Sequence, residues 1–243
     1  MEFGYDLWPQ VRLHTWKYRP RTEPIRLIQL HATRSGRVTI GGRPWTMDDE
    51  RKSSSNWFKS ANNKVPGAPH EAAMCTVLIG NGTLTRVMPE EMAPHHSLGH
   101  ADASGLSIEI CQPLDSVPFL PEDLRLAAEV CAEWSEKYDI PIKVLDFLSA
   151  DNHEAPGYVR HDRSAQGQRV GKSDPGAQFN DREFEAMVRG DDDMALAGEN
   201  RERMNRGAVM LKLASIGQAG TKPKALELWW ARAVLDAMEK AED

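Results

Sequence analysis

Residues 72–89 are the segment that most constrains the fold. Their sequence, AAMCTVLIGNGTLTRVMP, contains two apolar runs, 74–79 and 83–88, on either side of Gly80-Asn81-Gly82. Glycine and asparagine tolerate the positive φ angles that tight hairpin turns need, so the segment predicts two antiparallel strands. Because an isolated hairpin is only marginally stable in water, further strands are expected beside it.

Apolar runs elsewhere predict the rest of the sheet. Residues 25–30 (IRLIQL) and 106–110 (LSIEI) are short runs typical of buried strands, and 141–148 (PIKVLDFL) is a further strand or an extended edge. These runs are separated by segments with helical character. The alternation favours an α/β fold, in which a single domain has a mixed central β-sheet flanked by helices.

Three segments predict the helices of this domain. Residues 122–138 carry apolar side chains at helical spacing, with Pro121 in the first turn and Pro141 beyond the end. Shorter helices are expected at 53–61, where serines can cap the first turn, and in DREFEAMVR near the end of the domain. Residues 36–50 are interpreted as a turn-rich connection.

The chain of 243 residues divides into three parts. Residues 1–24 are interpreted as an irregular N-terminal lead-in that packs through Trp8 and Trp16, and residues 25–189 as the α/β domain. Residues 190–243 are interpreted as a linker, GDDDMALAG, followed by a helical C-terminal appendage of two helices. In the second helix, paired tryptophans at helical spacing indicate a core or an interface, with a carbohydrate-binding surface as the alternative.

Composition excludes several partners. Thirty basic and thirty-six acidic residues give a net charge of −6, which argues against a surface-wide grip on nucleic acid. No run approaches the roughly 20 apolar residues that cross a bilayer, so no membrane insertion is expected. The start of the chain lacks the basic and apolar regions of a secretory signal, which predicts synthesis in the cytoplasm without a signal peptide. The oligomeric state stays open.

Three residues that are far apart in the sequence have chemistry suited to a metal centre. His31 follows the strand at 25–30, His161 follows the strand-like GYV, and Asp174 lies in the turn KSDPG. Zinc accepts imidazole nitrogen and carboxylate oxygen, and a catalytic zinc site uses three protein ligands and keeps one position open. Two histidines and one aspartate satisfy that count, although each could instead be a hydrogen-bonded structural residue.

Four segments together resemble a known family. In chain order they are LIQLHATRSG, VLIGNGTLTRVMPEEMAPHH, GLSIEI and GYVRHDRSAQGQRVGKSDPGAQFN. They resemble the zinc-dependent N-acetylmuramoyl-L-alanine amidases, a family shared by phage lysozyme-like amidases, bacterial type 2 amidases and peptidoglycan recognition proteins. The resemblance covers roughly residues 23–189. It implies a Zn²⁺ cofactor and hydrolysis of the amide bond between N-acetylmuramic acid and L-alanine in peptidoglycan or a muropeptide.

The resemblance also implies roles for individual residues. It makes His31, His161 and Asp174 the zinc ligands. It makes Glu109 the general base and Lys172 the cation that faces the developing oxyanion. From the residues alone, Glu109 could equally be a solvent-facing strand residue and Lys172 a solvated turn lysine.

Other histidines are less clearly assigned. The family's imidazole in the loop after the hairpin corresponds to His96 or His100, either of which could bind substrate, and spacing does not decide between them. His153 is a rival ligand for His161, but the resemblance favours His161. Some phage members of the family carry a tyrosine on the strand before the hairpin. The corresponding position falls near Met74 here, so this tyrosine is missing.

The resemblance leaves more than one function to weigh. Retention of all three ligands together with Glu109 and Lys172 favours catalysis over a non-catalytic peptidoglycan-binding module. The sequence contains no HExxH motif, which argues against a zinc peptidase of another fold. The extra C-terminal helices and the long lead-in favour a phage or prophage endolysin, a bacteriolytic enzyme that degrades the cell wall after release. A cytoplasmic muropeptide-recycling amidase is the alternative.

Overall fold

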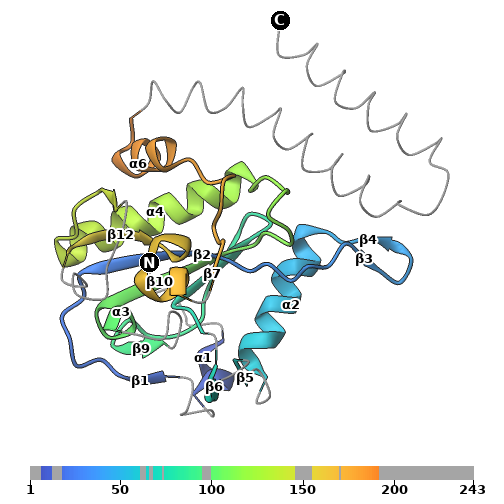
Figure 1. Cartoon of the computed structure of the whole chain (residues 1–243), viewed down its shortest axis with the longest axis horizontal. Coiled ribbons are helices and arrows are strands. Elements are labelled where there is room, and N and C mark those ends of the chain that lie inside the picture. The colour runs from blue at the N-terminus through green and yellow to red at the C-terminus, as the bar shows by residue number, and fades with distance from the viewer. Residues whose placement is uncertain are drawn as a thin grey trace, which may run out of the picture.

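A six-stranded sheet in the order β11-β12-β2-β10-β7-β8 forms the middle of the molecule (Figure 1). The computed structural model describes residues 7–12, 18–60, 64–65, 68–72, 74–94, 100–145, 155–169 and 171–191. The strands of the sheet are β2 (Leu27–Ala32), β7 (Val77–Gly80), β8 (Thr83–Arg86), β10 (Gly105–Ile110), β11 (Val144–Leu145) and β12 (Gly157–Arg160). Neighbouring strands are parallel except β7 and β8, so the sheet is mixed, as the sequence predicts.

The antiparallel pair β7 and β8 is the predicted hairpin. Asn81 and Gly82 adopt positive φ angles of 52° and 65° in its turn. Their backbone N–H groups donate to the Asp123 carboxylate at 3.0 and 2.7 Å. Because Asp123 lies in the first turn of helix α4 (Pro121–Tyr138), the hairpin turn is tied to that helix.

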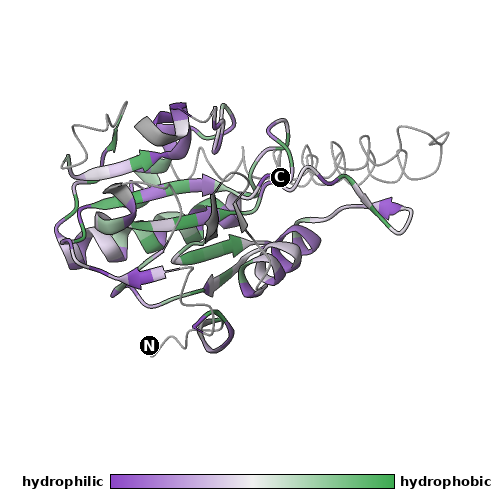
Figure 2. Ribbon diagram, turned by 60° about the horizontal axis from the view of Figure 1, so that its bottom comes forward, coloured by the Kyte–Doolittle hydropathy of each residue, from purple (hydrophilic) through white to green (hydrophobic). Residues whose placement is uncertain are grey.

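Helices cover both faces of the sheet (Figure 1). α4 and α6 (Asp181–Arg189) pack on one face, where Trp134 contacts a core that includes Ile28 and Leu30 of β2. α1 (Trp8–Val11) and α2 (Met47–Lys59) pack on the other face against Leu78 of β7. Side chains alternate between the two faces along each strand, so strands that are covered on both sides are apolar almost throughout. Figure 2 shows this concentration of hydrophobic residues in the central strands.

The helices at 122–138 and in DREFEAMVR are confirmed as α4 and α6. The helix expected at 53–61 begins earlier, at Met47, and ends at Lys59. The turn-rich interpretation of residues 36–50 is therefore wrong for the last four residues. Thr46 caps the helix and forms a capping box with Asp49, which starts the helix at that point. The hairpin of β3 (Thr39–Ile40) and β4 (Arg43–Pro44) precedes it.

The lead-in is more regular than the sequence predicts. It contains α1 and also β1 (Tyr18–Pro20), which pairs antiparallel with β9 (Met92–Pro94). Leu7 and Val11 are buried against the α2 face of the sheet. The expectation of an irregular lead-in is wrong for these two elements, because burial of Leu7 and Val11 orders α1 and backbone pairing with β9 orders β1. Trp16 and the side chain of Trp8 lie outside the described residues.

The remaining elements are short. They are β5 (Lys64–Val65), β6 (Ala68–Ala72), α3 (His100–Ser104), the 3₁₀ turn η2 (His161–Arg163) and α5 (Ala165–Arg169). Among the described residues, no helix is both long enough and apolar enough to span a membrane. The linker and the two helices are predicted for residues 190–243, of which 192–243 lie outside the described residues, so both stay predictions.

Candidate metal centre

Three segments bring His31, His161 and Asp174 together at one edge of the sheet. His31 is the fifth residue of β2. His161 directly follows β12, whose last residue, Arg160, lies opposite Leu30 of β2. The loop that carries Asp174 runs back alongside this strand end, where the Asp162 N–H donates to the Asp174 carbonyl at 2.7 Å. Carboxyl ends of parallel strands are the usual place for binding sites in such sheets.

The three side chains converge on one point. His31 Nδ1 lies 2.9 Å from His161 Nδ1. Asp174 Oδ2 lies 3.0 Å from His161 Nδ1 and 3.4 Å from His31 Nδ1. All three residues are buried, and they form a group that could hold a metal ion. The structure thus brings together the three residues that the sequence predicts as ligands.

The donor set fits zinc. Ligand bonds of 2.0–2.2 Å in a tetrahedral arrangement separate neighbouring donor atoms by about 3.3–3.5 Å. The donor atoms lie 2.9–3.4 Å apart here, so a small outward movement would admit the ion. Burial, together with the neighbouring His161, lowers the pKa of His31 to about 4, so its imidazole is neutral at pH 7. Burial alone would raise the pKa of Asp174, but hydrogen bonds with His161 and His31 outweigh it and hold that pKa well below its usual value. A neutral imidazole and an ionised carboxylate are the forms in which these residues bind metals.

Glu109 lies beside this group. In the parallel register of β10 and β2 it is opposite His31, so both side chains point to the same face of the sheet. Its Oε2 atom is buried and has no hydrogen-bond partner among the described residues. Burial, reinforced by the Asp174 carboxylate, raises the pKa of Glu109 to about 8. Glu109 is therefore a half-buried carboxyl group turned to the ligand side, not a freely solvated one.

Lys172 lies two residues before Asp174 and is exposed. Its backbone N–H donates to the Gly167 carbonyl at 2.8 Å, which anchors the segment that leads into the ligand turn. Its positive charge lowers the pKa of both His31 and Glu109, although by less than burial shifts them. The ammonium group therefore acts electrostatically on the ligand group and on the carboxyl group beside it.

A family model described as N-acetylmuramoyl-L-alanine amidase matches residues 21–177, which is more than half of the chain. The chain belongs to this family. It is accordingly an amidase that acts on peptidoglycan, and the family resemblance seen in the sequence is confirmed. No curated protein matches the chain at a significant level.

Several solved structures are similar to the amidase. A selenomethionine derivative of AmpD has 19% sequence identity and a TM-score of 0.48, over 71% of this chain and 90% of that chain. The PlyG catalytic domain has 16% identity and a TM-score of 0.42, over 92% and 100%. The Ph2119 endolysin from a Thermus scotoductus bacteriophage has 16% identity and a TM-score of 0.41, over 75% and 97%.

The other histidines of the sequence analysis have no described side chains. His96 and His153 lie outside the described residues, and His100 is the first residue of α3 with its side chain undescribed. The substrate-binding role of His96 or His100 therefore stays a prediction.

Sequence analysis missed Glu50, a buried carboxylate of α2 that holds the segment after His31. It accepts hydrogen bonds from the hydroxyl groups of Thr33 and Ser35, from Ser35 N–H at 3.2 Å and from Trp45 Nε1 at 2.8 Å. Thr33 Oγ1 in turn accepts from the Gln112 N–H, just after β10. The capping box that starts α2 was the signal that could have placed Glu50 in a helix facing this segment.

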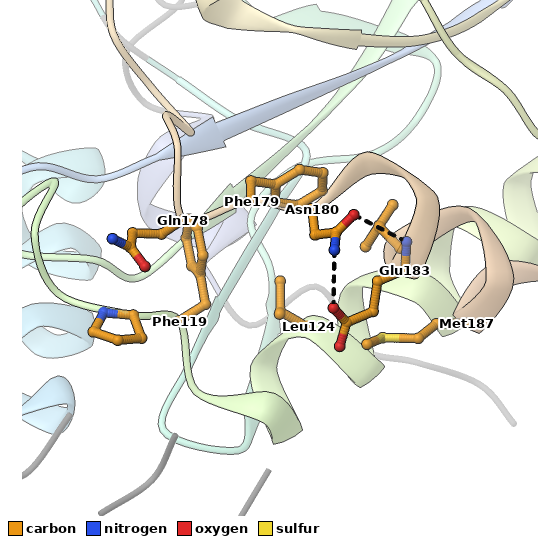
Figure 3. Close-up of a pocket in the computed structure, with 9 residues that line it drawn as sticks. Phe119, Leu124, Gln178, Phe179, Asn180, Glu183 and Met187 are labelled. Atoms are coloured by element: carbon orange, nitrogen blue, oxygen red, sulfur yellow. Dashed lines mark hydrogen bonds between the residues drawn. The ribbon is translucent and has the colours of Figure 1, made fainter. Parts of the chain in front are cut away.

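A separate small pocket of about 80 Å³ lies between the starts of α4 and α6 (Figure 3). Apolar side chains that include Phe119, Leu124 and Phe179 line it, and Asn180 at its rim donates to Glu183 Oε2 at 3.2 Å. None of the residues that form the metal centre lines this pocket. It belongs to the α4 face of the sheet, so it is not the reaction site.

Proposed function

We propose that the amidase is zinc-dependent, with His31, His161 and Asp174 as ligands, and that it cuts the amide bond between N-acetylmuramic acid and L-alanine. The observation that carries this proposal is the convergence of the three ligand atoms within 3.4 Å of one another. Lone pairs of two imidazoles and a carboxylate that meet in a buried place repel one another unless a cation or a proton lies between them. A divalent cation satisfies all three at once.

Amide hydrolysis needs a nucleophilic water, stabilisation of the carbonyl oxygen and a proton for the leaving amine. Bound zinc supplies a Lewis acid that polarises the carbonyl and lowers the pKa of water. In the proposed reaction, Glu109 accepts the proton of the attacking water and returns it to the departing nitrogen of L-alanine. A carboxyl group whose pKa lies within about one unit of neutral pH, as burial raises that of Glu109 to about 8, can both accept and return a proton.

Lys172 is proposed to stabilise the negative charge that develops on the carbonyl oxygen. An ammonium group on a flexible stem can follow this charge, and such electrostatic stabilisation typically contributes a few kcal/mol. The influence of the Lys172 charge on the pKa of Glu109 and His31 supports this role. His96 or His100 is proposed to contact the substrate.

For the biological role we propose a phage or prophage endolysin. The support is the amount of chain beyond the family match, which ends at residue 177 of 243 and leaves room for a segment that engages the cell wall. A recycling amidase would instead act on soluble muropeptides. Comparing turnover of intact sacculi with turnover of a soluble muropeptide separates these roles, and activity confined to the soluble substrate would contradict the endolysin role.

The experiment that tests the zinc proposal combines metal analysis with product analysis. Purified protein is expected to contain about one zinc ion per chain. Mass spectrometry of digested peptidoglycan is expected to find free L-alanine amino termini on stem peptides detached from the sugar. A chelator should stop this release and added Zn²⁺ should restore it. Undiminished release in the presence of chelator, with zinc absent from the protein, would overturn the proposal.

A further inference from the structure

We propose that Arg160 is a positioning residue that holds the loop carrying Asp174, and so sets the affinity of the site for its metal ion. This inference rests on the proposed zinc function of His31, His161 and Asp174. In the part of the chain that the structure describes, no hydrogen bond joins the Arg160 side chain to His31, His161 or Asp174. Arg160 acts through residues 176–181, where its guanidinium group donates to two backbone carbonyls and one carboxylate.

All five N–H donors of the guanidinium group are used. Nε and Nη2 donate to the two carboxylate oxygens of Asp162 at 3.0 and 2.6 Å. Nη2 also donates to the Gly176 carbonyl at 2.8 Å. Nη1 donates to the Asp181 carboxylate at 2.9 Å and to the Phe179 carbonyl at 3.3 Å. An arginine has five such donors, so the network has no spare capacity.

These bonds join the two parts of the chain that carry ligands. Arg160 is the last residue of β12 and directly precedes His161. Gly176, Phe179 and Asp181 follow Asp174 in the returning loop. The guanidinium group therefore fixes the distance between the strand end that presents His161 and the loop that presents Asp174.

The loop is also held by a second arginine, Arg34. Gly176 has a φ of +74°, and a Cβ atom at this position would lie 2.3 Å from Asp115 Oδ1 and 2.7 Å from Arg34 Nη2. Arg34 Nη2 donates to the Pro175 carbonyl at 2.9 Å and pairs with Asp115 at 2.8 Å. The backbone after Asp174 thus lies between two guanidinium groups, and Arg160 is the buried one of the two.

Asp174 depends on this support more than the other ligands do. His31 lies within a strand and His161 directly follows one, whereas Asp174 comes from a loop without regular structure. Partners that orient metal ligands typically change metal affinity by 10–100-fold when they are mutated. Because Asp162 and Asp181 balance the charge of Arg160, we infer that its effect on the site is geometric.

The test uses two lysine substitutions in the full chain. Arg160→Lys keeps the charge but offers three donors without the planar fork, so it cannot hold both aspartates and both carbonyl groups. Arg163→Lys is the matched control, because Arg163 also binds Asp181 and no bond joins it to the Gly176 or Phe179 carbonyl in the described structure. The readouts are the Zn²⁺ dissociation constant, from competition with a chromophoric chelator, and the visible absorption spectrum of bound Co²⁺.

We expect Arg160→Lys to weaken Zn²⁺ binding by roughly 10–100-fold and to change the Co²⁺ spectrum, which reports coordination geometry. Arg163→Lys should change the dissociation constant by less than about threefold and leave the spectrum as in wild type. Wild-type affinity in Arg160→Lys, or an equal loss in both variants, would overturn the inference while leaving the zinc proposal intact. If the wild-type chain itself binds no Zn²⁺, both proposals fail.

A second variant covers the case in which Arg160→Lys does not fold. Asp162→Asn removes the carboxylate that accepts from Nε and Nη2 of Arg160, so the guanidinium group is held less firmly at the loop carbonyls. A smaller weakening of Zn²⁺ binding, of roughly 3–10-fold, is expected, with the circular dichroism spectrum of the wild type. Unchanged affinity in this folded variant would contradict the proposal.

Discussion

Glu109 illustrates how one side chain acquires its chemistry from its place in a sheet. It is a carboxyl group in an apolar strand, it lies opposite His31 in the next strand, and the Asp174 carboxylate acts on it electrostatically. Burial therefore raises its pKa, where a solvated glutamate would keep an ordinary one. The same residue at an exposed position of α4 could not exchange a proton with a substrate near neutral pH.

Replacing Glu109 by Gln is predicted to remove the proton transfer and to keep the site. The amide has the size of the carboxyl group but cannot accept the proton of water, so kcat should fall by at least about a hundredfold. Zinc content and melting temperature should stay at or above the wild-type values, since a neutral group replaces a buried ionisable one. Amine release from a soluble muropeptide measures kcat, metal analysis measures the zinc content, and thermal unfolding followed by circular dichroism measures the melting temperature.

The matched control is Glu136→Gln, an exposed glutamate of α4 on the other face of the sheet. It should retain full activity. A Glu109→Gln variant with wild-type kcat would assign the base to another residue, whereas a variant without zinc would make Glu109 part of the metal site.

At the scale of elements, the buried carboxylate of Glu90 joins the hairpin to the long helix α4. Glu90 follows β8, and its carboxylate accepts from Trp134 Nε1 at 2.9 Å and from Lys137 Nζ at 2.7 Å. The Tyr138 hydroxyl group also donates to it. Burial alone would raise the pKa of Glu90, but these hydrogen bonds outweigh it and lower that pKa. The ionised form is thus favoured by folding.

Glu90→Gln is predicted to destabilise the protein by about 1–3 kcal/mol at pH 7, because charged hydrogen bonds to a buried group are lost. The pKa of Glu90 is lower in the folded protein than in the unfolded chain. Its contribution to stability is therefore complete above the usual carboxyl pKa and is lost as the pH falls through the lowered folded pKa. The difference in melting temperature between the variant and the wild type should shrink on acidification.

The control for the Glu90 variant is Glu133→Gln, on helix α4. Glu133 is exposed and pairs with Arg86 at 2.8 Å, so its loss should cost less than about 1 kcal/mol and should show little of this pH dependence. A stability difference for Glu90→Gln that stays constant from pH 7 to pH 3 would show that the carboxylate charge is not what joins the helix to the hairpin.

The elements that the sequence predicts well are those with local signals. Gly80-Asn81-Gly82 marks the hairpin, and Pro121 with the apolar period marks α4. The lead-in lacks such a signal, since Leu7 and Val11 are ordered by a distant core. The ligand group was predicted through family resemblance, but the networks of Glu50 and Arg160 were not. Both consist of hydrogen bonds between residues far apart in the chain, and no spacing in the sequence marks them.

For the whole molecule, the described structure places every proposed ligand before α6 ends. Gly190 closes that helix in the left-handed conformation with φ +70°, and Asp191 N–H donates to the Ala186 carbonyl at 3.1 Å. Among the described residues, the apolar cores on both faces of the sheet are formed by side chains up to Val188. We propose that the remaining chain is a separate unit that is needed for location and not for chemistry.

Removal of residues 192–243 is accordingly predicted to leave a folded enzyme, with kcat/KM on a soluble muropeptide within about threefold of the full chain. The cut retains Gly190 and Asp191, so the end of α6 keeps its cap. If the removed part engages the cell wall, hydrolysis of intact sacculi should fall by a larger factor than hydrolysis of the soluble substrate. Equal losses on both substrates in a folded protein would argue against a targeting role. A truncated chain that does not fold, judged by circular dichroism, would instead make residues 192–243 part of the core that supports the metal centre.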